Sequence, residues 1–458
     1  MRIIYFDIDC LRPDHLGCYG YERPISPNID RIAAGGTRLD NCYCSTSPCL
    51  PSRTAFHSGR LGIRNGVVSN HGAGANYRLR TNHYGGPCGD NMPLPRVLRQ
   101  AGMDTVCISN FADRHAAYGW MCGWSEFITP NLKGGNETAE EVNAHVLRWL
   151  RQNQGRRDYL LHINYWDAHR IYKMGSEWTS RLGGTPVPQA WPDDATIRSH
   201  YESVTGRFTA SGQFPGHRSP VPLMPGRIAN RADFERMVDA YDASIAYVDH
   251  HLGQVVSALA ADGGLEDTVI IVSADHGDAF GEHGIYTDHV CADECIHRVP
   301  MIIAWPGLAR AGQADDGLVY QLDLAATLCD ALGIRMPGDW DGNSFVGNLR
   351  GGNSLDRDHL VWDHALYAVQ RAVRTRDHLL IRTFDDGGYA GFDPVALYDM
   401  RRDRYQTSNI AEVQPELRDR MLGLLETWTA RQLSRPHAGP DPLELVLAER
   451  RAAMPRAG

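Results

Sequence analysis

Lysine is almost absent from this chain, and several kinds of segment are missing altogether. Of the 46 basic residues only Lys133 and Lys173 are lysine, so very few lysines are available for a catalytic role. No stretch approaches the roughly 18 to 20 consecutive apolar residues of a membrane-spanning helix. There is no block of basic residues and no acidic tail, although the net charge is −9. We therefore expect neither a membrane nor a nucleic acid as a partner.

The cysteines lack the spacing of disulfide frameworks and of zinc sites. Their number, 11, is odd, and no zinc-type histidine pattern follows Cys42, Cys44 and Cys49. Residues 2–9 predict a short strand instead of a signal peptide, because the apolar run is short and ends in two carboxylates. We therefore expect reduced thiols and a cytoplasmic protein, with Cys49 as the exception among the cysteines.

What the chain does contain is an alternation of strand-like and helix-like segments up to about residue 330. Strands are expected at 2–9, 103–109, 159–165, 268–273 and 299–305, and helices at 94–101, 137–152, 233–259 and 322–332. Strands separated by helices predict an α/β fold with a mostly parallel central sheet flanked by helices.

The pattern of expected elements changes near residue 342, after which short strands precede a helix at 415–433. This pattern predicts a small antiparallel sheet with one helix. We therefore expect a catalytic α/β domain over residues 1–345 and a smaller α+β subdomain over 346–458 that packs on it. The last ~20 residues are expected to be loosely ordered or to serve contacts in a homo-oligomer.

The most informative motif is the segment 49–60, which reads Cys-Leu-Pro-Ser-Arg-Thr-Ala-Phe-His-Ser-Gly-Arg. It resembles the signature of the type I sulfatases of the alkaline phosphatase superfamily; the alternative is a cysteine in a Pro-Ser turn that opens a helix. The resemblance implies that a formylglycine-generating enzyme oxidises Cys49 to formylglycine, whose hydrate attacks the sulfur of a sulfate ester. Arg53 would lie near the same helical turn and bind the hydrate and the sulfate through charge-assisted hydrogen bonds.

A second resemblance to this family lies at the end of the first expected strand. There the family has one or two adjacent aspartates that bind a divalent cation; this chain has Asp9 followed by Cys10, so only Asp9 matches. Asp7 lies two residues earlier on the same strand face and could contribute from the side. The alternative for either aspartate is a turn or a helix cap.

Asp275 and His276 follow the most strand-like run of the chain, and their segment resembles the second metal-binding block of the family. In a parallel sheet the chemistry lies at the carboxyl ends of the strands, where both aspartate segments fall. The resemblance implies one divalent cation held by Asp9, Asp275, His276 and the modified Cys49. This mixed oxygen and nitrogen set suits a hard cation such as Ca²⁺, Mg²⁺ or Mn²⁺, and its histidine tilts the choice modestly toward Mn²⁺. The resemblance to the family implies Ca²⁺.

Three departures from the family concern the groups around the leaving alcohol. Where many sulfatases have a lysine this chain has Asp288 and His289, and His289 is the candidate sulfate contact or general acid. His169 lies in a segment similar to the family's aromatic and Pro-His segment and is a second candidate acid. Arg114 and His115 stand where the family's Lys-x-His motif is expected, and they are candidates for the role of that lysine and histidine.

These segments predict hydrolysis of sulfate esters, of a sulfated carbohydrate or another small organic sulfate. Tryptophans with nearby arginines would suit a sugar ring with further anionic groups: Trp120, Trp124, Trp166 and Trp178. Two alternatives stay open. One is a phosphonate monoester or phosphodiester hydrolase with the same formylglycine site; the other is a non-catalytic protein that binds an anionic glycan and keeps Cys49 as a thiol.

Overall fold

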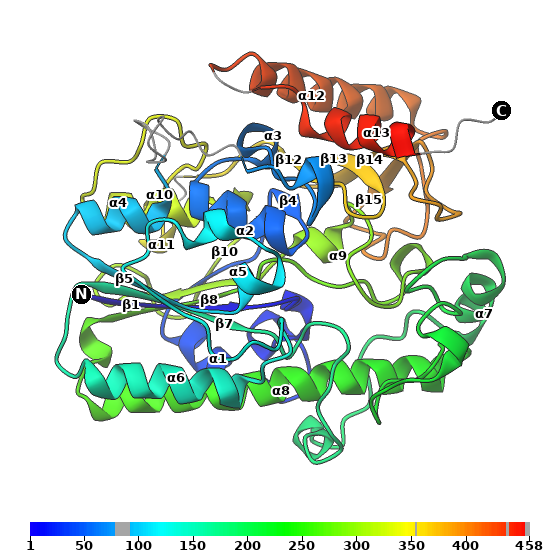
Figure 1. The fold of residues 1–458 in the computed structure, drawn as a ribbon. Helices are drawn as coiled ribbons and strands as arrows, with labels where there is room; N and C mark the ends of the chain where they lie inside the picture. Colours follow the sequence, from blue (N-terminus) through cyan, green and yellow to red (C-terminus); the bar gives the residue numbers. More distant parts are fainter. Residues whose placement is uncertain (78–91, 353–354, 437–438, 454–458) are drawn as a thin grey trace.

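An eight-stranded sheet forms the centre of the molecule in the computed structural model, which describes residues 1–77, 92–352, 355–436 and 439–453 (Figure 1). The strand order is β10-β2-β9-β8-β1-β7-β5-β6. The strands are β1 (Arg2–Ile8), β2 (Thr37–Leu39), β5 (Asp104–Ile108), β6 (Glu126–Ile128), β7 (Tyr159–Tyr165), β8 (Thr268–Ser273), β9 (Met301–Ala304) and β10 (Gln313–Asp315). Only β9 runs antiparallel to its neighbours, β8 and β2, so the predicted mostly parallel sheet is confirmed.

The three central strands β8, β1 and β7 are buried along their whole length. Ile3, Ile4 and Phe6 of β1 belong to the main core, as expected for a strand covered on both faces. The buried polar residues of these strands gather toward their carboxyl ends, where Asp7 is in register with Asn164 on one side and Ser273 on the other. This edge of the sheet therefore differs chemically from the rest of the core.

Helices cover both faces of the sheet (Figure 1). On one face lie α1 (Pro27–Ala34), α6 (Ala139–Gln152) and α8 (Arg231–Ala261), and on the other α2 (Cys49–Ser58), α4 (Leu94–Gln100) and α10 (Asp323–Ala331). Shorter elements complete this part of the chain: β3 (Cys42–Tyr43), α3 (Gly62–Asn65), α5 (Phe111–Arg114), α7 (Asp194–Ser203), α9 (Glu294–His297), β11 (Val319–Tyr320) and α11 (Val346–Leu349). In the described residues no helix is long and apolar enough to cross a membrane.

A second, five-stranded sheet has the order β15-β14-β13-β12-β4. Its strands are β4 (Thr46–Ser47), β12 (Leu360–His364), β13 (Val369–Arg374), β14 (His378–Asp385) and β15 (Val395–Asp399). The last four pair antiparallel, as predicted, and α12 (Pro415–Leu433) packs Met421 and Leu425 on this sheet. β4 pairs parallel with β12, so two residues just before Cys49 join a sheet built mainly from the C-terminal part. The proposed boundary between residues 345 and 346 stays a prediction.

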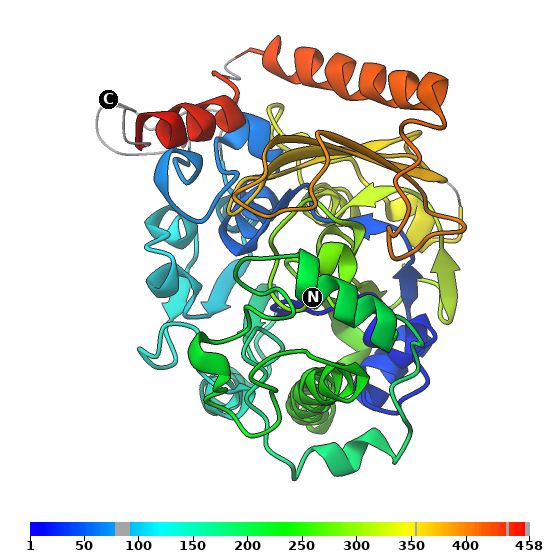
Figure 2. The same ribbon diagram turned by 90° about the vertical axis from the view of Figure 1, so that its right-hand side faces the viewer.

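A further helix near the C-terminus, α13 (Pro442–Ala453), was not predicted. Figures 1 and 2 show α12 and α13 above the second sheet. α13 buries Leu443, Val446 and Leu447 against Val68 and Val369. The segment expected to be loosely ordered is therefore helical up to Ala453, because its apolar residues find partners that are distant in sequence.

Candidate active site

The ends of β1 and β8 and the start of α2 meet at the polar edge of the central sheet. Since β1 and β8 are parallel neighbours, the chain leaves both strands at the same edge, which brings Asp9 close to Asp275. Ser52 in the first turn of α2 donates its hydroxyl to the Asp275 carbonyl oxygen at 2.6 Å, and Asp275 Oδ1 accepts from the Cys10 amide at 3.1 Å. These contacts hold Cys49 over the two strand ends.

Four predicted site residues converge there. The donor atoms of Asp9, Cys49, Asp275 and His276 all lie within 4.8 Å of one another, and all four side chains are buried. Cys49 Sγ lies 3.2 Å from His276 Nε2. The structure thus brings together the predicted ligand set; its role as a metal site stays a prediction.

Arg53 lies against three carboxylates at once. Its Nη1 donates to Asp9 Oδ2 at 2.8 Å and to Asp275 Oδ2 at 2.6 Å, and its Nε and Nη2 bind the two oxygens of Asp7 at 2.7 and 3.1 Å. Three buried carboxylates therefore face one guanidinium. Because uncompensated buried charge is costly, a divalent cation beside Asp9 and Asp275 fits this donor set.

Asp7 is placed apart from the four-residue group. In addition to Arg53 it contacts His162 Nε2 at 3.1 Å. Its carboxylate is not among the donor atoms of the described residues that cluster with Asp9. Its predicted contribution to the metal site is untested, and its position is that of a group that orients Arg53.

The buried charges of this site move the pKa values of its two strand-end carboxyl groups in opposite directions. Burial opposes ionisation of Asp9, but Arg53 together with His169, His276 and the hydrogen bond from Cys10 outweighs burial and keeps the pKa of Asp9 below its ordinary value. Burial, together with the charges of Asp9 and Asp7, raises the pKa of Asp275 well above its ordinary value. Burial, then Asp9 and Asp275, also raises the pKa of the Cys49 thiol strongly. An unconverted Cys49 would therefore be a poor thiolate nucleophile.

A second group of predicted residues lies beside Arg53. Arg114, at the end of α5, approaches His169 with an Nη2–Nε2 distance of 3.2 Å, and His169 Nδ1 lies 2.5 Å from the Arg170 carbonyl oxygen. Arg53 and Arg114 both lie over the Trp166 ring, at 5.4 and 5.1 Å from its centroid. Arg114 and His169 are therefore both positioned near the proposed nucleophile.

Several buried polar atoms in this region find no hydrogen-bond partner among the described residues: Arg114 Nε, His115 Nε2 and Trp166 Nε1. Burial and then Arg114 lower the pKa of His115 to about 3, so His115 is a neutral imidazole. Buried polar groups normally have partners. A bound anion or a sugar hydroxyl would supply hydrogen-bond partners for these atoms.

His289 is held between two carboxylates. Its Nδ1 lies 3.3 Å from Asp278 Oδ1 and its Nε2 lies 3.3 Å from Asp288 Oδ1. Burial lowers the pKa of His289, but Asp288 and Asp278 outweigh this effect and raise it to about 9. His289 thus carries a positive charge near the site, whereas neither ring nitrogen is free for substrate in this arrangement.

The predicted aromatic face for a sugar is mostly core. Trp120 and Trp124 pack on the buried His57 and on each other, and Trp178 packs on Tyr247. Of the four tryptophans only Trp166 adjoins the two arginines.

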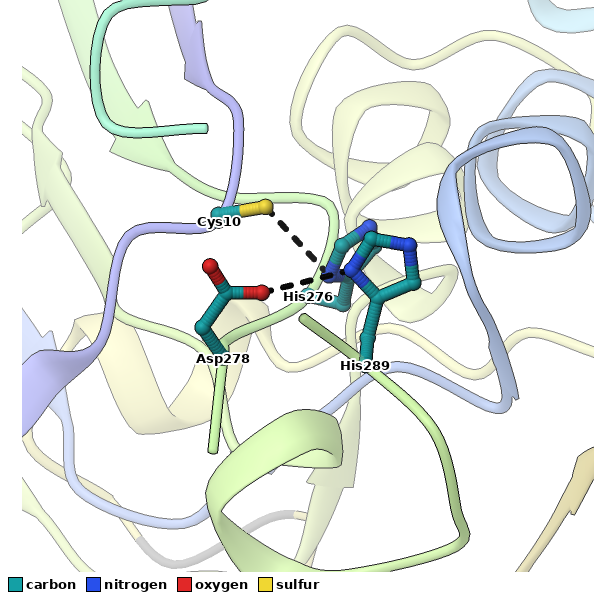
Figure 3. Close-up of side chains that lie close together, drawn as sticks. All are labelled: Cys10, His276, Asp278 and His289. Atoms are coloured by element: carbon teal, nitrogen blue, oxygen red, sulfur yellow. Dashed lines mark hydrogen bonds and ion pairs between the residues drawn. The ribbon is translucent and has the colours of Figure 1, made fainter. Parts of the chain in front are cut away.

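Sequence reasoning did not place Asp278 in the site and treated Cys10 only as the loss of an aspartate. The structure places both side chains against His276 and His289 (Figure 3). The signal available in the sequence was the spacing of the Asp-His-Gly-Asp run at 275–278, which puts a second carboxylate three residues after the first.

Comparisons with known proteins identify the architecture. The family model described as Sulfatase matches residues 2–334, and the model described as N-sulphoglucosamine sulphohydrolase, C-terminal, matches residues 281–427. An N-acetylglucosamine-6-O-sulfatase of Bacteroides thetaiotaomicron is 22% identical over 97% of this chain and 88% of its own length. An N-acetylgalactosamine-6-sulfatase of Rattus norvegicus is 26% identical over 78% and 67%.

Solved structures resemble the whole fold. A protein in complex with its substrate D-glucosamine-2-N,6-O-disulfate matches with a TM-score of 0.77 and 19% identity, covering 97% of this chain and 99% of that one. A phosphonate monoester hydrolase of Agrobacterium radiobacter matches with a TM-score of 0.73 and 18% identity, covering 94% and 95%. The predicted α/β architecture with its C-terminal antiparallel sheet is confirmed.

Proposed function

Because the chain belongs to the sulfatase family, we propose that it hydrolyses sulfate esters and that its substrate is a sulfated carbohydrate. The observation that carries the proposal is the convergence of Cys49 and Arg53 with the strand-end residues Asp9, Asp275 and His276. The carbohydrate class is supported by the amino-sugar sulfatases among the relatives and by the glucosamine disulfate bound to a structural neighbour.

In the proposed reaction Cys49 is first converted to formylglycine by a formylglycine-generating enzyme. The converted residue supplies a hydrated aldehyde as nucleophile, and a divalent cation held by Asp9, Asp275 and His276 supplies positive charge at the sulfate. Ca²⁺ is the proposed ion, with Mn²⁺ and Mg²⁺ as alternatives, since the donors are mainly carboxylate oxygens.

The chain's own residues then bind, orient and transfer a proton. Arg53, fixed by Asp7, binds the sulfate oxygens and the hydrate. Arg114 binds the anion beside it. His169 is the proposed donor to the leaving alcohol: burial lowers its pKa, but an anionic sulfate at hydrogen-bond distance favours its protonated form. His289 offsets the negative charge of Asp278 and Asp288.

The direct test compares a panel of 6-O- and 2-O-sulfated amino sugars and uronates with the matured enzyme. Peptide mass spectrometry across Cys49 establishes first that the thiol has become an aldehyde. Release of sulfate from at least one sugar supports the proposal. A fully converted protein that releases sulfate neither from these sugars nor from an aryl sulfate would contradict it.

A second candidate function is hydrolysis of a phosphonate monoester or phosphate diester. It is favoured by Asp288, a carboxylate near the position where many sulfatases have a lysine, because a less cationic pocket suits a singly charged diester. Parallel kcat/KM measurements on a sulfate monoester and a phosphate diester separate the two functions. A kcat/KM higher for the diester would make this the principal activity.

Removal of the cation is expected to cost both activity and stability. Chelation should abolish sulfate release, and Ca²⁺ should restore it. Loss of an ion that is present at a hundred times its Kd removes about 2.7 kcal/mol of folding free energy, because the ion binds only the folded state. Thermal unfolding with chelator and with added Ca²⁺ measures this effect.

The matched control for metal removal is Asp9→Asn, which keeps the volume of the side chain but weakens the site. Its unfolding temperature should respond less to Ca²⁺ than that of the parent. Full activity after exhaustive chelation would refute the metal requirement.

A further inference from the structure

A second cluster of metal-binding side chains lies directly beside the first (Figure 3). The donor atoms of Cys10, His276, Asp278 and His289 all lie within 4.8 Å of one another. All four residues are buried, and His289 is the most exposed of them at 4%. We infer that these four residues form a second metal site, selective for a thiolate-binding ion of the Zn²⁺ class.

The spacing of the donors fits a single ion. Cys10 Sγ lies 3.8 Å from His276 Nδ1, and Asp278 Oδ1 lies 3.3 Å from His289 Nδ1. Two ligands on the bonds of roughly 2.0–2.3 Å of a tetrahedral zinc site are about 3.3–3.8 Å apart. The pairs in Figure 3 are thus already at ligand separation, and the His276 and His289 rings are 4.2 Å apart between centroids.

The chemistry of the donors differs from that of the neighbouring site. The neighbouring site offers two carboxylate oxygens, one nitrogen of His276 and the side chain of residue 49, whereas this cluster offers one sulfur, two imidazole nitrogens and one carboxylate oxygen. Thiolate and imidazole ligands favour Zn²⁺ over Ca²⁺ or Mg²⁺. Four protein ligands also close a tetrahedral shell, as in structural zinc sites.

Outer contacts orient two of the proposed ligands. The second oxygen of Asp278, Oδ2, accepts the hydroxyl of Tyr172 at 2.8 Å. The second nitrogen of His289, Nε2, faces Asp288 Oδ1 at 3.3 Å. A carboxylate behind a ligating histidine is the usual outer partner in metal sites, because it fixes the ring and raises its basicity.

His276 is shared by the two sites through its two nitrogens, and ligation through both requires the ring to lose its N–H proton to solvent. Nε2 faces Cys49 at 3.2 Å, and Nδ1 faces Cys10. Nδ1 also lies 2.9 Å from the Gly277 carbonyl oxygen, a contact that ligation replaces. Cys10 then serves the second site, which gives a role to the residue that stands where the family can have a second aspartate.

The second site decides which histidine moves the proton. The ion would replace the proton that His289 carries on Nδ1 in the metal-free protein. With Nδ1 bound to the ion and Nε2 paired with Asp288, neither nitrogen can reach the leaving alcohol. His169 then remains the candidate proton donor, and its Nε2 must leave Arg114 Nη2, now at 3.2 Å, to reach the leaving alcohol. This consequence rests on the proposed function, whereas the site itself does not.

The test counts metals and identifies the thiolate ligand without measuring turnover. The protein carrying Cys49→Ala, which removes the neighbouring thiol, is loaded with Zn²⁺ or Co²⁺, dialysed and analysed by elemental mass spectrometry and absorption spectroscopy. We expect one tightly bound equivalent in the presence of excess Ca²⁺ and, for Co²⁺, a thiolate-to-metal charge-transfer band in the near ultraviolet. Adding Cys10→Ser should remove the band and the bound equivalent.

Two further variants keep the result interpretable. Cys44→Ser, which changes another buried thiol outside the cluster, should retain both the band and the metal. Asp278→Asn keeps the thiol but should weaken retention at least tenfold, and it serves if Cys10→Ser does not fold. A Cys49→Ala protein that folds but retains no Zn²⁺, or whose Co²⁺ spectrum lacks the band, would overturn the site whatever the enzyme hydrolyses.

Discussion

Replacing Cys49 with alanine is expected to abolish sulfate release, lowering kcat by at least ~10⁴-fold, the scale seen when a catalytic nucleophile is removed. The reason is chemical: alanine cannot be oxidised to an aldehyde, so the chain loses its nucleophile while Arg53 and the strand-end carboxylates stay in place. Steady-state assays on matured parent and variant, with formylglycine content measured by mass spectrometry, give the ratio.

The matched control for this substitution is Cys44→Ala, another buried cysteine close in sequence. It should keep activity, and both variants should lose only the modest stability of one small core truncation. Substrate binding by Cys49→Ala should persist, because Arg53 and Arg114 remain. If Cys49 stays a thiol in the parent despite a working maturation enzyme, and parent and Cys49→Ala bind a sulfated sugar equally without turnover, the binding-protein alternative holds instead.

The elements that the sequence predicted well are those with strong local patterns. β7 and β8 were predicted at their observed bounds, since short segments rich in aliphatic, β-branched and aromatic residues identify buried strands even where polar residues interrupt them, as in β7. α12 was likewise predicted at 415–433. β4 and α13 were missed for a different reason. β4 is two residues long and exists only through its pairing with β12, and α13 is stabilised by Val68 and Val369 from distant segments.

The same division applies to the site. Asp9, Asp275 and Cys49 could be placed together because parallel strand ends share one edge and a family motif marks the cysteine. The place of Asp7 could not be foreseen: alternation puts it on the face of Asp9, but only the docking of α2 decides that Arg53 takes its carboxylate. Cys10 is held with φ 58°, a conformation rare outside glycine, so its direction is not readable from sequence.

Replacing Arg53 with methionine is expected to destabilise the metal-free protein by about 3–5 kcal/mol, the usual result of removing one partner from a buried ion pair. Methionine keeps much of the volume, but Asp7, Asp9 and Asp275 lose their shared guanidinium and are left close together in the core. Equilibrium urea unfolding of parent and variant, each in chelator, measures the change.

The cation makes this prediction specific to the proposed site. An ion beside Asp9 and Asp275 offsets part of the repulsion between the carboxylates that Arg53 no longer neutralises. The destabilisation should therefore be clearly smaller in saturating Ca²⁺ than in chelator. Arg53→Lys is the control: it restores one positive charge but not the fork that binds Asp7 through two nitrogens, so it should recover part of the stability and little of the activity. An equal loss of stability with and without Ca²⁺ would mean that no ion binds next to these carboxylates. The negative charge of Asp7, Asp9 and Asp275 would then be offset by Arg53 without a cation.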